Sequence, residues 1–170
     1  MIAAPIRRER WYTRIAPLAT VIGAVLLDLL WVPVPGFNAV APAFAVMAVY
    51  CWAIWRPDFL PYTGVFMAGL LDDLIRGTPL GTGALALLSV QGFVWAQQRL
   101  LRSRSFEVLW LGFALTSLIA AAVTWGAIAF AYRSVISPWP GGMQYVLTVA
   151  AFPALAFLLM RIERGLPRPA

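Results

Sequence analysis

The sequence predicts an all-α membrane protein, a bundle of six transmembrane helices that forms one polytopic domain over residues 1–170. Apolar residues make up 62% of the chain and charged residues only 12%, whereas a soluble domain is about half apolar and about a quarter charged. A mean hydropathy of +0.81 indicates that much of the apolar surface faces lipid. This composition excludes a soluble globular domain and a disordered chain.

Six apolar stretches follow one another, and each is close to the ~20 residues that a helix needs to cross a ~30 Å hydrocarbon core. Prolines mark their ends, where a missing N–H is tolerated. The first span ends at Pro33, the second stops before Pro57, the third lies between Pro57 and Pro79, and the fourth begins at Pro79. A turn with Pro138 and Pro140 separates the last two. The predicted spans are 15–33, 39–55, 58–75, 79–98, 107–132 and 142–160.

The distribution of arginines sets the expected orientation, because short cytoplasmic loops carry an excess of basic residues. All 13 basic residues are arginines. Eleven lie in the two tails and in the second and fourth loops, whereas only Arg76 and Arg133 lie on the opposite side. We therefore expect a multi-pass protein of the bacterial cytoplasmic (inner) membrane with both termini in the cytoplasm and its basic segments against anionic lipids. The scatter of the arginines over four short segments argues against nucleic-acid binding.

Three aspartates, Asp28, Asp72 and Asp73, lie inside predicted spans, where charge is costly. An aspartate near the centre of a membrane helix costs ~2.5–3.5 kcal/mol, so such residues usually face protein or water and have partners. The orientation places all three in the outer half of the membrane. Residues four apart share one face of a helix. Two such stripes are Ala16, Thr20, Ala24 and Asp28 on the first span and Gly64, Ala68, Asp72 and Arg76 on the third.

Arg76 is the expected partner of the acids on the third span, because Asp72 can pair with it at i+4 and Asp73 at i+3. We interpret the group as a structural clasp that fixes helix packing; the alternative is a polar site or hinge near the outer face. Since Asp72 shares its stripe with Gly64 and Ala68, we expect Asp72→Asn to disturb assembly or partner binding more than Asp73→Asn.

The sequence contains no catalytic set. The chain has no histidine and no lysine, and Cys51 is its one cysteine. This excludes His-dependent acid–base catalysis, a Ser–Lys dyad and a zinc cluster. The run Asp72-Asp73-Leu74-Ile75-Arg76 begins like the DDxxD motif that holds magnesium in membrane prenyltransferases, but arginine takes the last position. We expect no enzymatic activity, no cofactor and no metal.

The segment Gly69-Leu70-Leu71-Asp72-Asp73-Leu74-Ile75-Arg76-Gly77-Thr78-Pro79-Leu80-Gly81 resembles the MreD family of rod shape-determining membrane proteins. That family has a helix that ends in a Gly-Leu and aspartate pattern, followed by a short turn with Leu-Gly into the next helix. An earlier segment, from Pro33 through Tyr50 to Pro57, is also similar to the family. The number of spans and the basic tails fit as well.

The resemblance implies a non-enzymatic scaffold of the elongasome, which builds lateral peptidoglycan and maintains rod cell shape. It implies binding to MreC and, through MreC, association with MreB, RodA and a class B penicillin-binding protein. It also implies a fold like the substrate-binding S-components of energy-coupling-factor vitamin transporters. The alternative is a small-ligand-binding or transport subunit of that S-component type, which aspartates in the outer half of a small bundle also suit.

The resemblance carries Asp72, Pro79 and Gly81 over from the family, whereas Asp28 is inferred from its stripe as a possible intramembrane polar partner. We expect one motif to serve helix packing and partner docking. Its members are Gly64, Ala68, Gly69, Asp72, Asp73, Arg76, Gly77, Pro79 and Gly81.

Overall fold

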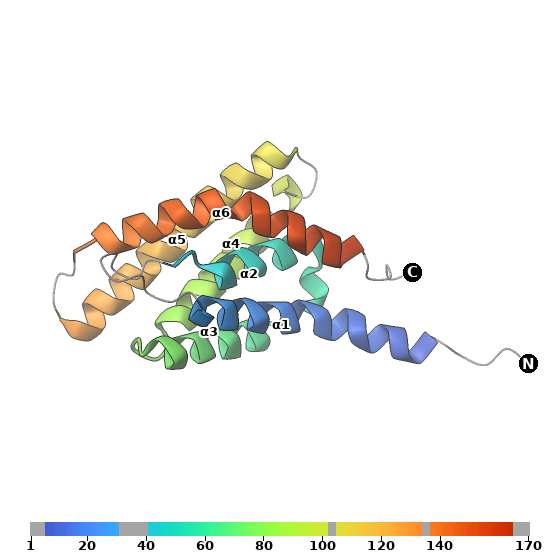
Figure 1. The fold of residues 1–170 in the computed structure, drawn as a ribbon, viewed down its shortest axis with the longest axis horizontal. Helices are drawn as coiled ribbons and strands as arrows, with labels where there is room; N and C mark the ends of the chain where they lie inside the picture. The colour runs from blue at the N-terminus through green and yellow to red at the C-terminus, as the bar shows by residue number, and fades with distance from the viewer. Residues whose placement is uncertain (1–5, 31–40, 102–104, 134–136, 165–170) are drawn as a thin grey trace, which may run out of the picture.

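The computed structural model describes residues 6–30, 41–101, 105–133 and 137–164, and these residues form an all-helical bundle. Figure 1 shows the chain running back and forth through the bundle, with the start of the first helix and the end of the last at the same end. The elements are α1 (Ile6–Leu30), α2 (Phe44–Trp55), the short 3-10 helix η1 (Pro57–Phe59), α3 (Tyr62–Arg76), α4 (Thr82–Leu101), α5 (Phe106–Tyr132) and α6 (Trp139–Arg164).

The last two helices have the length and composition of membrane spans. α5 and the segment Trp139–Glu163 of α6 are each long and apolar enough to cross a bilayer. Only 22% of the most apolar part of each is buried within the chain. An apolar helix with so few buried residues is unfavourable in water, because burial of apolar surface drives folding there. The structure is therefore consistent with a helical membrane protein.

α2 is the central helix, and it packs against α1, α4, α5 and α6. Nine of its 12 residues are buried. At 1.5 Å per residue it is about 18 Å long, shorter than the ~30 Å hydrocarbon core. The chain continues through η1 and the buried Leu60, whose carbonyl accepts a hydrogen bond from the Gln91 side chain at 2.7 Å. This hydrogen bond satisfies a buried backbone carbonyl that has no partner within a helix.

Aromatic side chains join α2 to the long hairpin of α5 and α6. The rings of Phe113 and Phe152 stack with centroids 4.0 Å apart, and Tyr50 meets both edge-on. The Tyr50 hydroxyl donates to the carbonyl of Leu109 at 2.8 Å. This buried hydroxyl therefore has a partner, and the aromatic cluster fixes α5 and α6 on the central helix.

Among the described residues, an α-helix overlaps each predicted apolar stretch, but the boundaries differ. The second, third and fourth helices begin later than predicted, at Phe44, Tyr62 and Thr82. A proline precedes each start by one to three residues, because proline lacks an N–H and suits turns and first positions rather than helix interiors. α1 begins before the predicted span, and α6 extends beyond both ends of its span. The predicted parts at 31–33 and 39–40 lie outside the described residues.

Candidate functional site

Asp73 holds the turn between α3 and α4. The residue is 2% exposed, and its carboxylate accepts four hydrogen bonds. The hydroxyls of Thr78 and Thr82 donate to Oδ1 at 2.8 and 2.7 Å. The backbone N–H groups of Gly81 and Gly83 donate to Oδ2 and Oδ1, at 2.8 and 2.7 Å. The carboxylate thus satisfies donors at the start of α4, the positive end of the helix dipole.

Two glycines give the turn its shape. Gly77 ends α3 in the left-handed conformation, with φ 67°, and its N–H bonds to the carbonyl of Asp73. Gly81 has a φ angle of 101°, a backbone conformation that residues other than glycine rarely adopt. The carbonyl of Pro79 accepts the hydroxyl of Thr82 at 2.9 Å. The glycine, proline and threonine pattern therefore encodes one specific turn that brings α4 back against α3.

Two further glycines of the motif allow close helix packing. A Cβ atom on Gly69 would lie 2.4 Å from the Cα of Ala84, so α3 and α4 touch there through their backbones. A Cβ on Gly64 would lie 2.7 Å from a methyl group of Leu18, on the side of α3 that faces α1. Ala68 is buried between these positions in the sequence. The small-residue stripe of the third span is therefore a packing surface.

Arg76 links α1 and α3 by two ion pairs. Its Nη2 lies 2.7 Å from Asp28 Oδ2, and its Nε lies 2.8 Å from Asp72 Oδ1. Asp28 Oδ1 also accepts the N–H of Phe44 at 3.0 Å, which adds the start of α2. The predicted pair of Asp72 and Arg76 is present. The suggested i+3 pairing of Asp73 with Arg76 is wrong within the described residues, because the turn directs that carboxylate to α4.

Replacement of Arg76 by glutamine is expected to loosen the contact of α1 with α3. The side chain of Asp28 is 2% exposed and would lose its charged partner, whereas Arg76 is 30% exposed, so we expect a loss of about 2 kcal/mol in the free energy of unfolding. Unfolding of the purified protein by SDS in mixed micelles measures this loss. Arg133→Gln, at the exposed C-terminal end of α5, is the matched control. Equal stability of the two variants would show that the clasp does not hold the helices.

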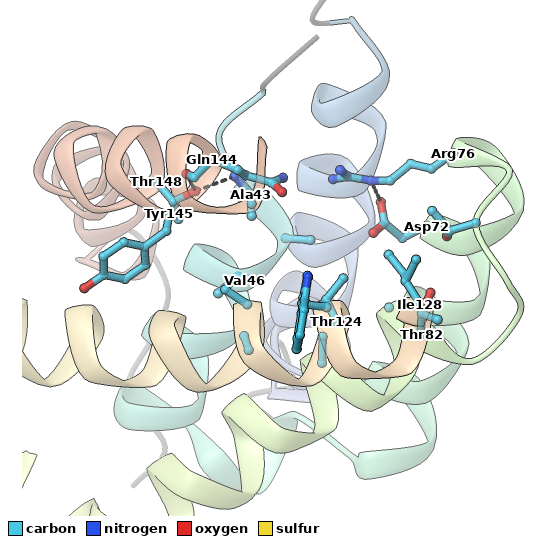
Figure 2. A pocket seen from close by; sticks show the side chains of 18 of the residues that line it. Ala43, Val46, Asp72, Arg76, Thr82, Thr124, Ile128, Gln144, Tyr145 and Thr148 are labelled. Atoms are coloured by element: carbon cyan, nitrogen blue, oxygen red, sulfur yellow. Dashed lines mark hydrogen bonds and ion pairs between the residues drawn. The ribbon is translucent and has the colours of Figure 1, made fainter. Parts of the chain in front are cut away.

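A cavity of about 320 Å³ lies beside the ion pairs, and all six α-helices contribute to its wall. Figure 2 shows Asp72 and Arg76 on one side of it, with Gln144 and Thr148 of α6 on the other and Thr124 of α5 below. Thr148 Oγ1 accepts the N–H of Ala43 at 3.0 Å, so the start of α2 is tied to this wall too. The volume is within the usual range for sites that hold small ligands, about 300–1,000 Å³.

The predicted site residues divide into two groups. Asp28, Asp72, Asp73 and Arg76 line the cavity. The other members of the motif form the α3–α4 turn or pack α3 against its neighbours: Gly64, Ala68, Gly69, Gly77, Pro79 and Gly81.

The polar side chains that α5 and α6 contribute to the cavity were not predicted, because the second half of the chain has the pattern of generic apolar helix. Thr124, Gln144 and Thr148 all line the cavity. Gln144 and Thr148 are four residues apart, so they share one face of an otherwise apolar helix. The spacing of these two polar residues could have predicted a polar face on the last helix. The partners of Asp73 across the turn were also missed, since hydrogen bonds of this kind follow no helical period.

The paired aspartates do not form a shared cation site. The carboxylate of Asp72 faces Arg76, whereas that of Asp73 is occupied by donors of the turn and of α4. Among the residues described, no group of three or more histidine, cysteine, aspartate or glutamate side chains is placed to hold a metal ion. The arrangement is suited to charge pairing and hydrogen bonding by a group that enters the cavity.

These features are consistent with a helical membrane protein that has a charged network beside a largely apolar cavity at one end of its bundle. The chain is 29% identical over 157 residues to the rod shape-determining protein MreD of Haemophilus influenzae, covering 91% of this chain and 93% of that protein. This similarity confirms the resemblance to the MreD family of rod shape-determining proteins. No family model matches the chain, and no solved structure matches it.

Proposed function

We propose that the chain is a non-enzymatic scaffold of the bacterial inner membrane that maintains rod shape and lateral peptidoglycan synthesis by binding MreC. The similarity to MreD over nearly the whole length carries this proposal. The family resemblance supplies MreC as the direct partner and MreB, RodA and a class B penicillin-binding protein as indirect ones. Because the similarity spans both the turn motif and the second half of the chain, it favours the scaffold over a vitamin-binding subunit.

The proposal includes six membrane spans, both termini in the cytoplasm and a fold like the S-components of vitamin transporters. The six α-helices of the described residues support the number of spans. The start of α1 and the end of α6 lie at one end of the bundle, as an even number of crossings requires (Figure 1). α2 is too short to cross alone, and Arg56 and Leu60, on either side of η1, are the buried residues that follow it.

We further propose that a segment of the partner docks in the cavity between α3 and α6. Three members of the predicted motif, Asp72, Asp73 and Arg76, line it, which supports a link between that motif and docking. Donors and acceptors line the opposite wall as well, from Gln144 and Thr124. Polar side chains in a largely apolar wall suit a peptide segment, whose backbone needs hydrogen-bond partners when water is excluded.

Depletion of the protein in its rod-shaped host is expected to give rounded cells with dispersed wall synthesis, because the scaffold no longer positions the synthases. Light microscopy with a fluorescent peptidoglycan label measures both effects. A plasmid copy of the wild-type chain should restore rods. Cells that stay rod-shaped with unchanged lateral labelling would contradict the proposal.

Purification in mild detergent separates the scaffold from its alternative. The tagged chain should retain the MreC protein of the same bacterium when the two are co-expressed, and mass spectrometry identifies the retained protein. A stoichiometric vitamin in the purified chain, together with no retained MreC, would favour the transport subunit.

A further inference from the structure

The wall of the cavity carries an excess of negative charge. Its charged residues are three aspartates and one arginine, Asp28, Asp72, Asp73 and Arg76. Arg133, the other arginine expected on the outer side, is not among the lining residues. A charge without a counter-charge is costly in a membrane or a protein interior. A cationic group in the cavity would therefore be stabilised where a neutral or anionic one would not.

Asp72 is the carboxylate that remains open to such a group. Both oxygens of Asp28 and of Asp73 already accept hydrogen bonds. Only Oδ1 of Asp72 is bonded to Arg76, and Oδ2 has no hydrogen bond to the described residues. The Asp72 side chain is 14% exposed, compared with 2% for Asp28, so it can be reached from the cavity.

We infer that the segment that docks in the cavity presents a lysine or arginine side chain to Asp72. This inference rests on the proposed function, because it specifies the chemistry of the proposed occupant. The cation would complete an alternating arrangement in which Asp28, Arg76, Asp72 and the incoming group are each next to an opposite charge. Charge-assisted hydrogen bonds of this kind are roughly twice as strong as neutral ones.

Two observations favour a protein segment over a metal ion as the source of the positive charge. One open carboxylate oxygen is too few for a hard cation, which takes six or more oxygen ligands. The opposite wall presents the Gln144 amide, and Figure 2 shows this side chain and Arg76 projecting toward one another across the space. This amide can both donate and accept hydrogen bonds, so it suits the peptide backbone of the partner segment next to the charged side chain that faces Asp72.

The test uses the full-length chain co-expressed with the MreC protein of the same bacterium, with binding measured in mild detergent. Asp72→Asn removes the charge and keeps the shape, and it should weaken binding about tenfold. Thr124→Trp fills part of the cavity without a change in charge and should weaken binding to a similar degree. Asp58→Asn, the same substitution at an exposed site at the other end of α3, is the control and should bind like the wild type.

Carbodiimide treatment of the wild-type complex provides a second readout, because the reagent joins a carboxylate to a nearby lysine amine through an amide bond with loss of water. A cross-linked peptide that contains Asp72 and a partner lysine would support the inference directly. For an arginine, replacement of that partner residue by alanine should weaken wild-type binding about tenfold and leave binding of the Asp72→Asn variant unchanged.

The outcomes separate this inference from the proposed function. If the wild-type chain retains no MreC, the proposed function fails. If it retains MreC and both Asp72→Asn and Thr124→Trp bind as well as the wild type, the function stands and the cavity is not the docking site. If Thr124→Trp alone weakens binding, the segment docks in the cavity without a cation at Asp72, and the inference is overturned.

Discussion

Replacement of Asp73 by alanine is expected to lower the free energy of unfolding by about 3 kcal/mol, the largest effect of any polar substitution in the motif. The change removes an acceptor for four donors at once. The hydroxyls of Thr78 and Thr82 can rotate to other acceptors. The N–H groups of Gly81 and Gly83 cannot, and an unsatisfied buried donor costs free energy comparable to a lost hydrogen bond. SDS-induced unfolding in mixed micelles, followed by circular dichroism, measures the loss.

Asp72→Asn and Asp58→Asn are the matched controls for an Asp73→Asn variant. An amide at position 73 keeps the size of the side chain but turns one oxygen into a donor that faces N–H and O–H groups. In the Asp72→Asn variant the amide oxygen can still accept a hydrogen bond from the Nε–H of Arg76. The loss of stability should therefore be less than half of that in the Asp73→Asn variant. Equal losses at positions 72 and 73 would mean that the carboxylate of Asp73 does not hold the turn.

These expectations divide roles that the sequence pattern assigned to Asp72 alone. The shared stripe with Gly64 and Ala68 predicted the greater effect on assembly or partner binding for Asp72. From the geometry we expect Asp73, which is buried in the turn, to affect mainly stability, and Asp72, which has an open oxygen in the cavity, to affect mainly partner binding. A comparison of unfolding and partner binding in the two variants tests this division, because each variant should impair mainly one of them.

Helical periodicity predicted the contacts that lie within one helix. The pair of Asp72 and Arg76 follows from their spacing of four residues, and the pattern of apolar stretches gives all six helices. The pair of Asp28 and Arg76 spans 48 residues, so it depends on how α1 packs against α3. Sequence spacing contains no information on that packing. The small-residue stripes indicate that the helices approach closely but not which ones meet.

The cavity also depends on contacts between helices that sequence spacing does not predict. Its wall takes residues from six helices, and only the part from α1 and α3 carries charges that stand out in an apolar sequence. Thr124, Gln144 and Thr148 are uncharged, and threonine is common in membrane helices because its hydroxyl can bond to the helix backbone. Thr148 does this with the carbonyl of Gln144 at 2.6 Å and also bonds to α2. The second bond appears only when the fold is known.

Replacement of Gly69 by valine is expected to prevent the native packing of α3 on α4. Even a single added carbon would lie 2.4 Å from the Cα and 2.6 Å from the N of Ala84, and backbone atoms cannot rotate out of the way. The helices must separate, which would displace Asp73 from the donors at the start of α4. Overpacking in a tight core typically costs about 1–3 kcal/mol, and the coupled loss of the capping bonds adds to it. We therefore expect an unfolded or degraded protein in cells and no rescue of rod shape.

Gly92→Val in the middle of α4 is the matched control, because a Cβ there would meet nothing within 4 Å beyond the adjacent residues and backbone of its own helix. Both substitutions place a β-branched residue in a helix, so the intrinsic helix propensity changes equally. The level of protein in membranes, measured by immunoblot, and the shape of the complemented cells give two readouts. If Gly69→Val accumulates and restores rods like Gly92→Val, then α3 and α4 do not meet through their backbones, and the turn of Asp73 cannot be the feature that joins them.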